Sequence, residues 1–218
     1  KRKMVDISKN LNSKRFLLTY LVIIGFLLVF WVIQMRLMHE DNRDIPIEML
    51  AYLESPPREF TDIYIDLNEE QALTIDWFKN KWSFVYFSHG KCLPLCRPSL
   101  ETMKLIQSSF TSKDFQFLVI GLDGDNETEA SLARFLSAQQ FHFDVASASS
   151  EKVEALAREF RALFIKTNTS DGRYLIEQEH HIFVIDPKGR IYATLKPPFN
   201  INLQEDISNM RYFYARTE

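Results

Sequence analysis

The chain has 218 residues, of which 46% are hydrophobic and 13% aromatic, and its formal net charge is −3. This length allows one or two domains with a substantial core. The slight negative charge gives no electrostatic basis for binding nucleic acid. Two cysteines are too few for a fold that depends on several disulfides.

Residues 16–35 (FLLTYLVIIGFLLVFWVIQM) contain no charged side chain. About twenty helical residues span the roughly 30 Å hydrocarbon layer of a bilayer. A secretory signal peptide has a shorter apolar core and ends at a small-residue cleavage site, and residues 31–44 offer no such site. We therefore predict a single uncleaved transmembrane helix at residues 16–36.

The charges on the two sides of this helix differ. Six basic residues and one acid, Asp6, precede it, whereas the acids that follow it outnumber the basic residues Arg36 and Arg43. The positive-inside rule makes residues 1–15 a cytoplasmic basic tail and places the chain beyond about residue 38 outside. No Arg/Ser-rich mitochondrial presequence is visible. We predict a bacterial inner-membrane protein, rather than a mitochondrial one, whose domain lies in the oxidising periplasm.

Residues 37–58 are polar and contain three prolines, which predicts a linker that leads into a domain at residues 59–218. Within the domain, apolar runs of strand length alternate with helical patterns. The predicted strands are 60–67, 82–88 and 115–123, and the predicted helices are 99–110, 127–141 and 150–164. A hairpin (181–195, with the turn DPKG) and a final helix (202–214) follow. This order predicts a three-layer α/β domain behind the transmembrane helix.

Both cysteines, Cys92 and Cys96, lie in the turn between the strand at 82–88 and the helix that begins near Pro98. Open α/β sheets often carry their chemistry at this edge, and a helix N-terminus lowers the pKa of a thiol. A spacing of four puts both sulfurs on one face of a helical turn. The pair can be a structural bridge, a redox centre or a metal clamp. The bridge is the least favoured, because so short a loop gains little stability from closure.

Thiol–disulfide exchange and copper binding are the two functional alternatives. Thioredoxin-type enzymes have two residues between their cysteines and a proline opposite them. Here three residues intervene, and no proline lies between Pro98 and Pro187. Thiolates select Cu(I), and an added imidazole makes a site that also holds Cu(II). His180 and His181 stand where the proline would be expected, and His89 is the other nearby imidazole.

Three segments of the chain resemble the Sco/SenC family. Residues 81–100 are similar to its strand followed by C-x-x-x-C-P-x-x-L, and residues 143–164 to its short strand and helix. Residues 174–191 (YLIEQEHHIFVIDPKGRI) are similar to its Y-h-V-D-H-S…Y-L-I-D-P-x-G-R, where h is apolar. The resemblance implies a thioredoxin-like fold and a copper site. It also implies a role in delivering copper to the copper-bearing subunit of cytochrome c oxidase, or in reducing that subunit's thiols.

Two positions depart from the family pattern. Arg97 stands in place of a proline, and Gln178 falls on the copper-ligating histidine. If residues 178–181 are extended, His180 shares a face with Gln178 and His181 points the other way. We therefore predict a redox pair, Cys92 and Cys96, that binds one copper ion, Cu(I) or Cu(II), with His180 as third ligand.

The chain is thus expected to be a metallochaperone, with thiol–disulfide reductase activity as its enzymatic side. Two alternatives stay open. One is a periplasmic thiol–disulfide oxidoreductase without copper, which the glutamine at the ligand position favours. The other is an oxidase-associated structural subunit in which the fold serves only docking. The sequence does not choose between His180, His181 and His89 as the imidazole ligand.

Overall fold

The computed structural model describes residues 17–35, 45–61, 63–68, 71–110, 113–170 and 172–218. The chain divides into two compact units, residues 1–45 and 46–218, and each is described by itself. The predicted basic tail at residues 1–15 lies outside the described residues.

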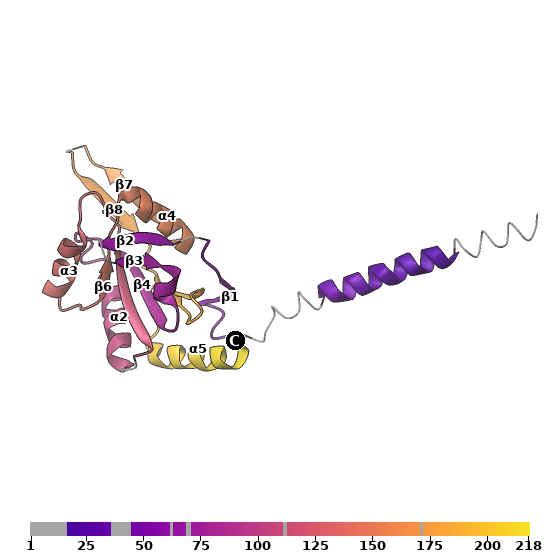
Figure 1. Cartoon of the computed structure of the whole chain (residues 1–218). Coiled ribbons are helices and arrows are strands. Elements are labelled where there is room, and N and C mark those ends of the chain that lie inside the picture. Colours follow the sequence, from indigo (N-terminus) through magenta and orange to yellow (C-terminus); the bar gives the residue numbers. More distant parts are fainter. Residues whose placement is uncertain (1–16, 36–44, 62, 69–70, 111–112, 171) are drawn as a thin grey trace, which may run out of the picture. The chain divides into compact units, whose positions relative to one another are not determined.

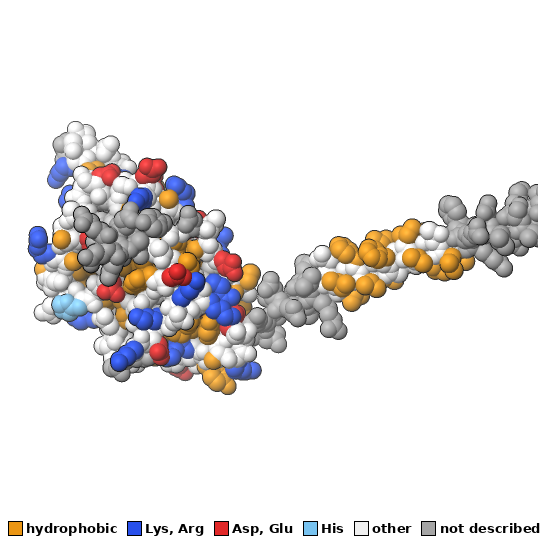
Figure 2. All heavy atoms as spheres, viewed as in Figure 1, with side chains coloured by type: hydrophobic (Ala, Val, Ile, Leu, Met, Phe, Trp, Pro, Cys, Tyr) orange, Lys and Arg blue, Asp and Glu red, His pale blue; other side chains and the backbone are white. Residues whose placement is uncertain are grey.

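The first unit contains a helix, Leu17–Met35, of 19 residues with a mean hydropathy of 2.4. None of the apolar stretch within this helix is buried, and Figure 2 shows apolar side chains along the visible side of the helix. Within the described part of the chain, this is the helix whose length and composition allow it to cross a membrane. A signal sequence near the N-terminus meets the same criterion.

A six-stranded mixed sheet forms the middle of the second unit (Figure 1). The order of its strands is β1-β10-β9-β4-β5-β6. Its strands are β1 (Leu53–Arg58), β4 (Trp82–Ser88), β5 (Phe115–Gly121), β6 (Asp144–Ala146), β9 (Ile182–Ile185) and β10 (Ile191–Leu195). β4, β5 and β6 run parallel, whereas β9 is antiparallel to β4 and β10 is antiparallel to β9. Every residue of β4 is buried, because helices cover both faces of the sheet.

Four helices cover this sheet. They are α2 (Arg97–Ser109), α3 (Glu129–Ala138), α4 (Ser150–Phe160) and α5 (Leu203–Thr217). Buried side chains of α2, α3 and α5 pack with Phe84 and Tyr86 of β4, while those of α4 pack with Val85 and Phe87. Alternate residues of one strand thus enter two cores on opposite faces. The predicted three-layer α/β architecture is confirmed.

Two short hairpins complete the unit. β2 (Tyr64–Asn68) pairs with β3 (Gln71–Thr74), and a 3-10 turn, η1 (Ile75–Phe78), follows. β7 (Phe164–Asn168) pairs with β8 (Tyr174–Gln178) and projects from the rest of the unit (Figure 1). The helix predicted to reach residue 164 ends at Phe160. Arg161 adopts the left-handed conformation there, with φ of 56°, and its N–H bonds back to the carbonyls of Ala157 and Arg158.

Strand β1 falls inside the stretch for which we predicted a linker. Leu53–Arg58 includes Pro56 and Pro57 and still pairs with β10. Proline lacks the N–H that an inner strand must donate, so it is tolerated at the edge of a sheet. β1 occupies the edge of the six-stranded sheet. A proline-rich sequence therefore hides an edge strand.

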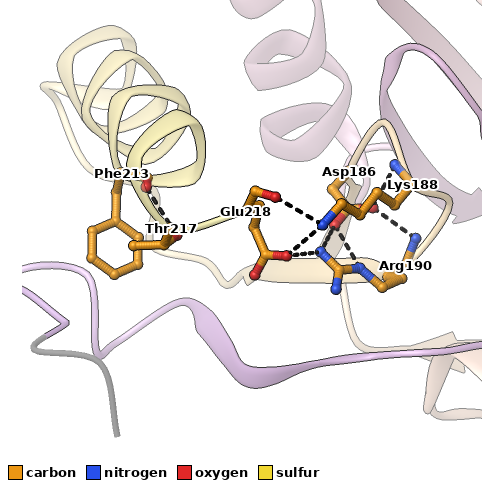
Figure 3. A network of polar contacts seen from close by, with 6 residues as sticks. All are labelled: Asp186, Lys188, Arg190, Phe213, Thr217 and Glu218. Atoms are coloured by element: carbon orange, nitrogen blue, oxygen red, sulfur yellow. Dashed lines mark hydrogen bonds and ion pairs between the residues drawn. The ribbon is translucent and has the colours of Figure 1, made fainter. Parts of the chain in front are cut away.

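The predicted β9–β10 hairpin is present, and its turn is fixed by a buried carboxylate. Asp186 accepts hydrogen bonds from the backbone N–H groups of Lys188 and Arg190, and the Arg190 guanidinium contacts it at 2.6 Å. Glu218, which follows α5, lies 2.8 Å from Nζ of Lys188 and 2.9 Å from Nη2 of Arg190 (Figure 3). These contacts attach the end of the last helix to the turn.

Candidate functional site

The two cysteines lie in the predicted turn between β4 and α2. Cys96 is the N-cap of α2, and Pro98 stands in the first helical turn. The N–H of Cys96 donates to the carbonyl of Cys92, which closes one helical turn between them. Their sulfurs form a disulfide, and their Cα atoms are 5.5 Å apart. A spacing of four thus brings the two sulfurs together.

Both cysteines are buried, but Cys92 is 5% exposed, and of the two only Cys92 is in contact with the cavity beside this turn. Cys96 is fully buried, whereas Cys92 lines a cavity of about 420 Å³. The hydroxyl of Ser88, the last residue of β4, lies 3.3 Å from Sγ of Cys92. An attacking group that enters the cavity therefore meets Cys92 and not Cys96.

The opposite wall of the cavity is formed by β8 and the residues after it, among them Gln178 and His180. Gln178 Nε2 donates to the carbonyl of Phe87 at 2.6 Å and to the hydroxyl of Tyr86 at 3.1 Å. Nδ1 of His180 lies 2.8 Å from the same hydroxyl. Gln178 and His180 therefore converge on one tyrosine of the central strand. The Oε1 atom of Gln178 is buried and has no hydrogen-bond partner among the residues that the structure describes.

His181 faces away from this cluster. Its Nδ1 pairs with Glu179 at 3.4 Å, and its ring packs near Phe183, which belongs to the core on the other face of the sheet. β8 ends at Gln178 and β9 begins at Ile182, so both histidines lie in the connection between strands. The structure brings His180 to the cysteine cavity and leaves His181 outside its lining.

His89 also lines the cavity and is 7% exposed. Its Nδ1 accepts a hydrogen bond from the N–H of Lys91 at 3.3 Å. Burial lowers the pKa of His89, although the charge of Asp123 opposes this shift. Burial, with a smaller effect of His181, also lowers the pKa of His180. Both rings are therefore neutral near pH 7 and keep a nitrogen lone pair.

Among the residues that the structure describes, no three His, Cys, Asp or Glu side chains are grouped in a way that could hold a metal ion. The two predicted sulfur ligands are joined to each other. Only after reduction would they offer thiolates beside the imidazole of His180. The structure thus shows the oxidised form of the pair, in which Cys92 and His180 line one cavity and Cys96 lies buried behind Cys92 in the disulfide.

The sequence reasoning missed four polar residues next to this cavity: Tyr86, Ser88, Asp123 and Glu127. In the sequence, Tyr86 and Ser88 belong to an apolar run that predicts a strand and gives no sign of a polar role. Asp123 ends the predicted strand at 115–123, and a carboxylate at the carboxyl edge of a buried strand is a signal that could have been used. Glu127 is the first residue of the helix predicted at 127–141. In the structure its Oε1 accepts a hydrogen bond from the N–H of Gly90.

A thioredoxin-like protein with a redox-capable cysteine pair is the class that this fold and turn define. The family model described as SCO1/SenC matches residues 62–210. The chain therefore belongs to the SCO1/SenC family.

Two curated relatives are similar over part of their length. The Arabidopsis thaliana protein SCO1 homolog 2, mitochondrial, is 22% identical over 135 residues, which are 61% of this chain and 49% of that protein. The Bos taurus protein SCO2 homolog, mitochondrial, is 24% identical over 119 residues, 51% of this chain and 44% of the relative. The chain thus spans about half the length of the curated relatives it matches.

Solved structures of Sco proteins share the fold. Arabidopsis thaliana ScoI with copper bound has a TM-score of 0.62 at 17% identity, and the match covers 71% of this chain and 99% of that one. Yeast Sco1 with copper bound has a TM-score of 0.61 at 20% identity, covering 71% and 90%. The apo Sco1 protein of Thermus thermophilus has a TM-score of 0.62 at 18% identity, covering 74% and 94%. The predicted thioredoxin-like fold is confirmed.

Proposed function

We propose that the chain is a membrane-anchored copper chaperone of the Sco type that serves cytochrome c oxidase assembly. It would carry one copper ion on Cys92, Cys96 and His180. The observation that supports this most is that Cys92, which is bonded to Cys96, and His180 line one cavity. Arabidopsis ScoI and yeast Sco1 are described with copper bound. A further structural relative, BsSco, is described as a member of a family of cytochrome c oxidase assembly proteins with a disulfide switch.

The donor set fits copper. Soft thiolates bind Cu(I), and an imidazole added to them gives a site that Cu(II) also accepts. The position of Cys96 at the N-terminus of α2 favours its thiolate. His180 uses Nδ1 toward Tyr86, so Nε2 is the nitrogen left for a metal. Gln178 is a poorer candidate, because the atom that it could offer to a metal is a hard amide oxygen, which suits copper less well than an imidazole does.

Before it binds copper, the pair has to be reduced by an external dithiol. A thiolate of the dithiol attacks Sγ of Cys92, the S–S bond breaks, and Cys96 leaves as a thiolate. The second thiol of the reductant then displaces Cys92 and closes the reductant's own disulfide. Two electrons pass from the dithiol to the cysteine pair, and the protons of the dithiol balance the new thiolates. The same exchange in reverse would let the reduced pair act on a disulfide of the acceptor.

The proposed partner is the copper-bearing subunit of an oxidase, and the proposed location is a bacterial inner membrane. Leu17–Met35 would be the single anchor at residues 16–36, residues 1–15 the cytoplasmic tail and residues 59–218 the periplasmic domain. A reporter fused after residue 60 should be active only in its exported form. A soluble mature chain that begins near residue 40 would contradict the anchor.

The second candidate is a thiol–disulfide oxidoreductase that does not bind copper. Gln178 favours it, because this residue stands where the family resemblance places a histidine ligand. The two candidates differ in what the reduced protein binds, while both predict a disulfide that external thiols can reduce.

Titration of the reduced protein with each copper ion separates these functions. We expect one Cu(I) to bind to the thiolates in every variant that keeps both cysteines. Cu(II) should give a sulfur-to-copper charge-transfer band that is lost in His180→Ala and retained in the matched control His181→Ala. If neither ion binds, the copper proposal is wrong and the oxidoreductase takes its place. Retention of the band in His180→Ala would leave copper binding intact but exclude His180 as the ligand.

A further inference from the structure

A buried carboxylate outside the cysteine turn connects to both strands of the β7–β8 hairpin. Asp123, at the end of β5, is 5% exposed. It accepts hydrogen bonds from the hydroxyl of Tyr174 on β8 and from Nζ of Lys166 on β7, the latter at 2.9 Å. Asn126 donates a third at 2.9 Å. The Nζ atom of Lys166 also lies 4.2 Å from the centre of the Tyr174 ring.

The acceptor of these bonds is an ionised carboxylate, and one of the donors, Lys166, is a cation. Burial opposes ionisation of Asp123, but the donors Tyr174, Asn126 and Lys166 outweigh it and lower the pKa of the carboxyl group. The bond to Asp123 raises the pKa of Tyr174 to about 12, so the phenol stays protonated and donates. Hydrogen bonds to an ionised acceptor are roughly twice as strong as neutral ones. The contact is therefore a strong attachment at neutral pH.

The hairpin depends on attachments of this kind. Within the described residues its two strands form a sheet of their own, and an isolated two-stranded hairpin is marginal in water. At its base, Phe164 and Ile176 pack against the core, and Gln178 bonds to β4. Its outer half begins at the Lys166–Ile176 pair, where Ile176 still contacts the core, and extends through the Asn168–Tyr174 pair. Asp123 holds this outer half.

The outer half matters because it forms part of the cysteine cavity. Tyr174, Leu175 and Ile176 line it opposite Cys92. The connection that carries Asp123 also reaches the cysteine side of the cavity, since Glu127 Oε1 accepts the N–H of Gly90 at 2.8 Å. In addition, Nζ of Lys91 lies 4.9 Å from the Tyr174 ring. One connection, residues 122–128, thus touches both walls.

We propose that Asp123 is a positioning residue that fixes the hairpin wall of the cavity and thereby limits which thiols reach Cys92. It does not touch the reacting sulfurs and acts through Tyr174 and Lys166. The inference rests on the proposed function in one respect only, that exchange at the Cys92–Cys96 disulfide is part of the protein's work. It requires no copper.

The test uses Asp123→Asn and Tyr174→Phe in the oxidised, metal-free full chain in detergent. Asp125→Asn is the matched control, because it removes the same charge from the same connection while Asp125 bonds to Ser150 instead of the hairpin. We expect amide exchange in the outer half of the hairpin to accelerate about tenfold or more, the factor for losing a hydrogen bond to a charged group. Exchange in β4 and β5 should be unchanged.

Reduction rates give the functional readout. In both variants the disulfide should be reduced faster by a bulky thiol, glutathione, while the rate with a small thiol, 2-mercaptoethanol, changes less. The effects of the two substitutions should not add in the double variant, because both act on the bond between Asp123 and Tyr174. If amide exchange in the hairpin is unchanged in both variants, Asp123 does not attach the hairpin and the proposal is wrong. Unchanged discrimination between the two thiols, or the same change in Asp125→Asn, would overturn the role in access. Since neither readout involves metal, a protein that fails to bind copper still tests this proposal.

Discussion

The hydroxyl oxygen of Tyr86 lies 2.8 Å from Nδ1 of His180. Burial raises the pKa of Tyr86, so the phenol remains protonated and can donate to the ring or accept from it. Gln178 donates to the same oxygen at 3.1 Å. The imidazole is thus held through one nitrogen, which leaves Nε2 for a ligand. Partners of this kind orient a metal-binding histidine and fix its tautomer.

Tyr86→Phe should therefore weaken Cu(II) binding by roughly 10- to 100-fold, the usual effect of removing such a partner. Cu(I) binding should change less, because the thiolates carry it. Competition titration of each ion into the reduced protein measures both effects. Tyr192→Phe is the matched control, since Tyr192 is also buried on this face of the sheet but packs against Trp82 and Tyr214 instead of His180. Equal Cu(II) affinity in Tyr86→Phe and wild type would show that the hydroxyl does not support the ligand.

Much of the central fold was predictable because burial on both faces leaves a plain trace in the sequence. β4 (Trp82–Ser88) and β5 (Phe115–Gly121) are almost continuous apolar runs, as parallel strands under two helical layers require. The cysteine turn follows from the same pattern, since a buried strand and a proline-led helix leave only a few residues between them. The spacing of four predicts that the two sulfurs lie on one face of a turn, which suits a disulfide and a shared metal ion equally.

The β7–β8 hairpin and the edge strand β1 were harder to predict from the sequence pattern. The helix pattern runs on through residue 164, and nothing local shows that Arg161 adopts a left-handed conformation and ends it. β1 is obscured by its two prolines. The attachment of the hairpin joins Asp123 to Tyr174, which is 51 residues further along the chain. Contacts of this range depend on the tertiary fold, and no periodicity encodes them.

The second prediction concerns the stability that the disulfide provides. The double variant Cys92→Ser, Cys96→Ser should fold and unfold cooperatively, because each face of the sheet has its own apolar core. Closing so short a loop stabilises by about 2 kcal/mol at most. Urea unfolding of the fragment 46–218 is measured for the oxidised wild type and for the double variant. The difference between their free energies of unfolding is the stability that the disulfide provides. Loss of a cooperative transition in the double variant would mean that the bridge is structural.

The third prediction concerns acid. Because burial lowers the pKa of His89 in the folded state, the unfolded chain takes up a proton near pH 6.5 while the folded chain does not. Stability is therefore complete above about pH 7 and falls as the pH drops through 6.5 toward the lower folded pKa. His180 and His181 contribute in the same direction. Urea midpoints of the oxidised fragment at pH 7, 6 and 5 should decrease, and less steeply in His89→Gln. An equally steep decrease in that variant would assign the acid sensitivity to other groups.

The last prediction concerns the turn between β9 and β10 (Figure 3). The Asp186 side chain is fully buried and accepts from Nε and Nη2 of Arg190 at 2.9 and 2.6 Å. Arg190→Ala leaves this carboxylate buried with only the two backbone donors of the turn, and breaking a buried ion pair on one side costs about 3 kcal/mol.

Lys188→Ala is the control. Its side chain is 46% exposed, so its pair with Glu218 should contribute no more than about 1 kcal/mol. Chemical unfolding of the fragment 46–218 measures both changes. If the two variants lose equal stability, the turn is held by its backbone hydrogen bonds and the buried pair adds nothing. If Arg190→Ala loses the larger amount, the buried charge of Asp186 makes the guanidinium necessary, whereas Lys188 remains replaceable.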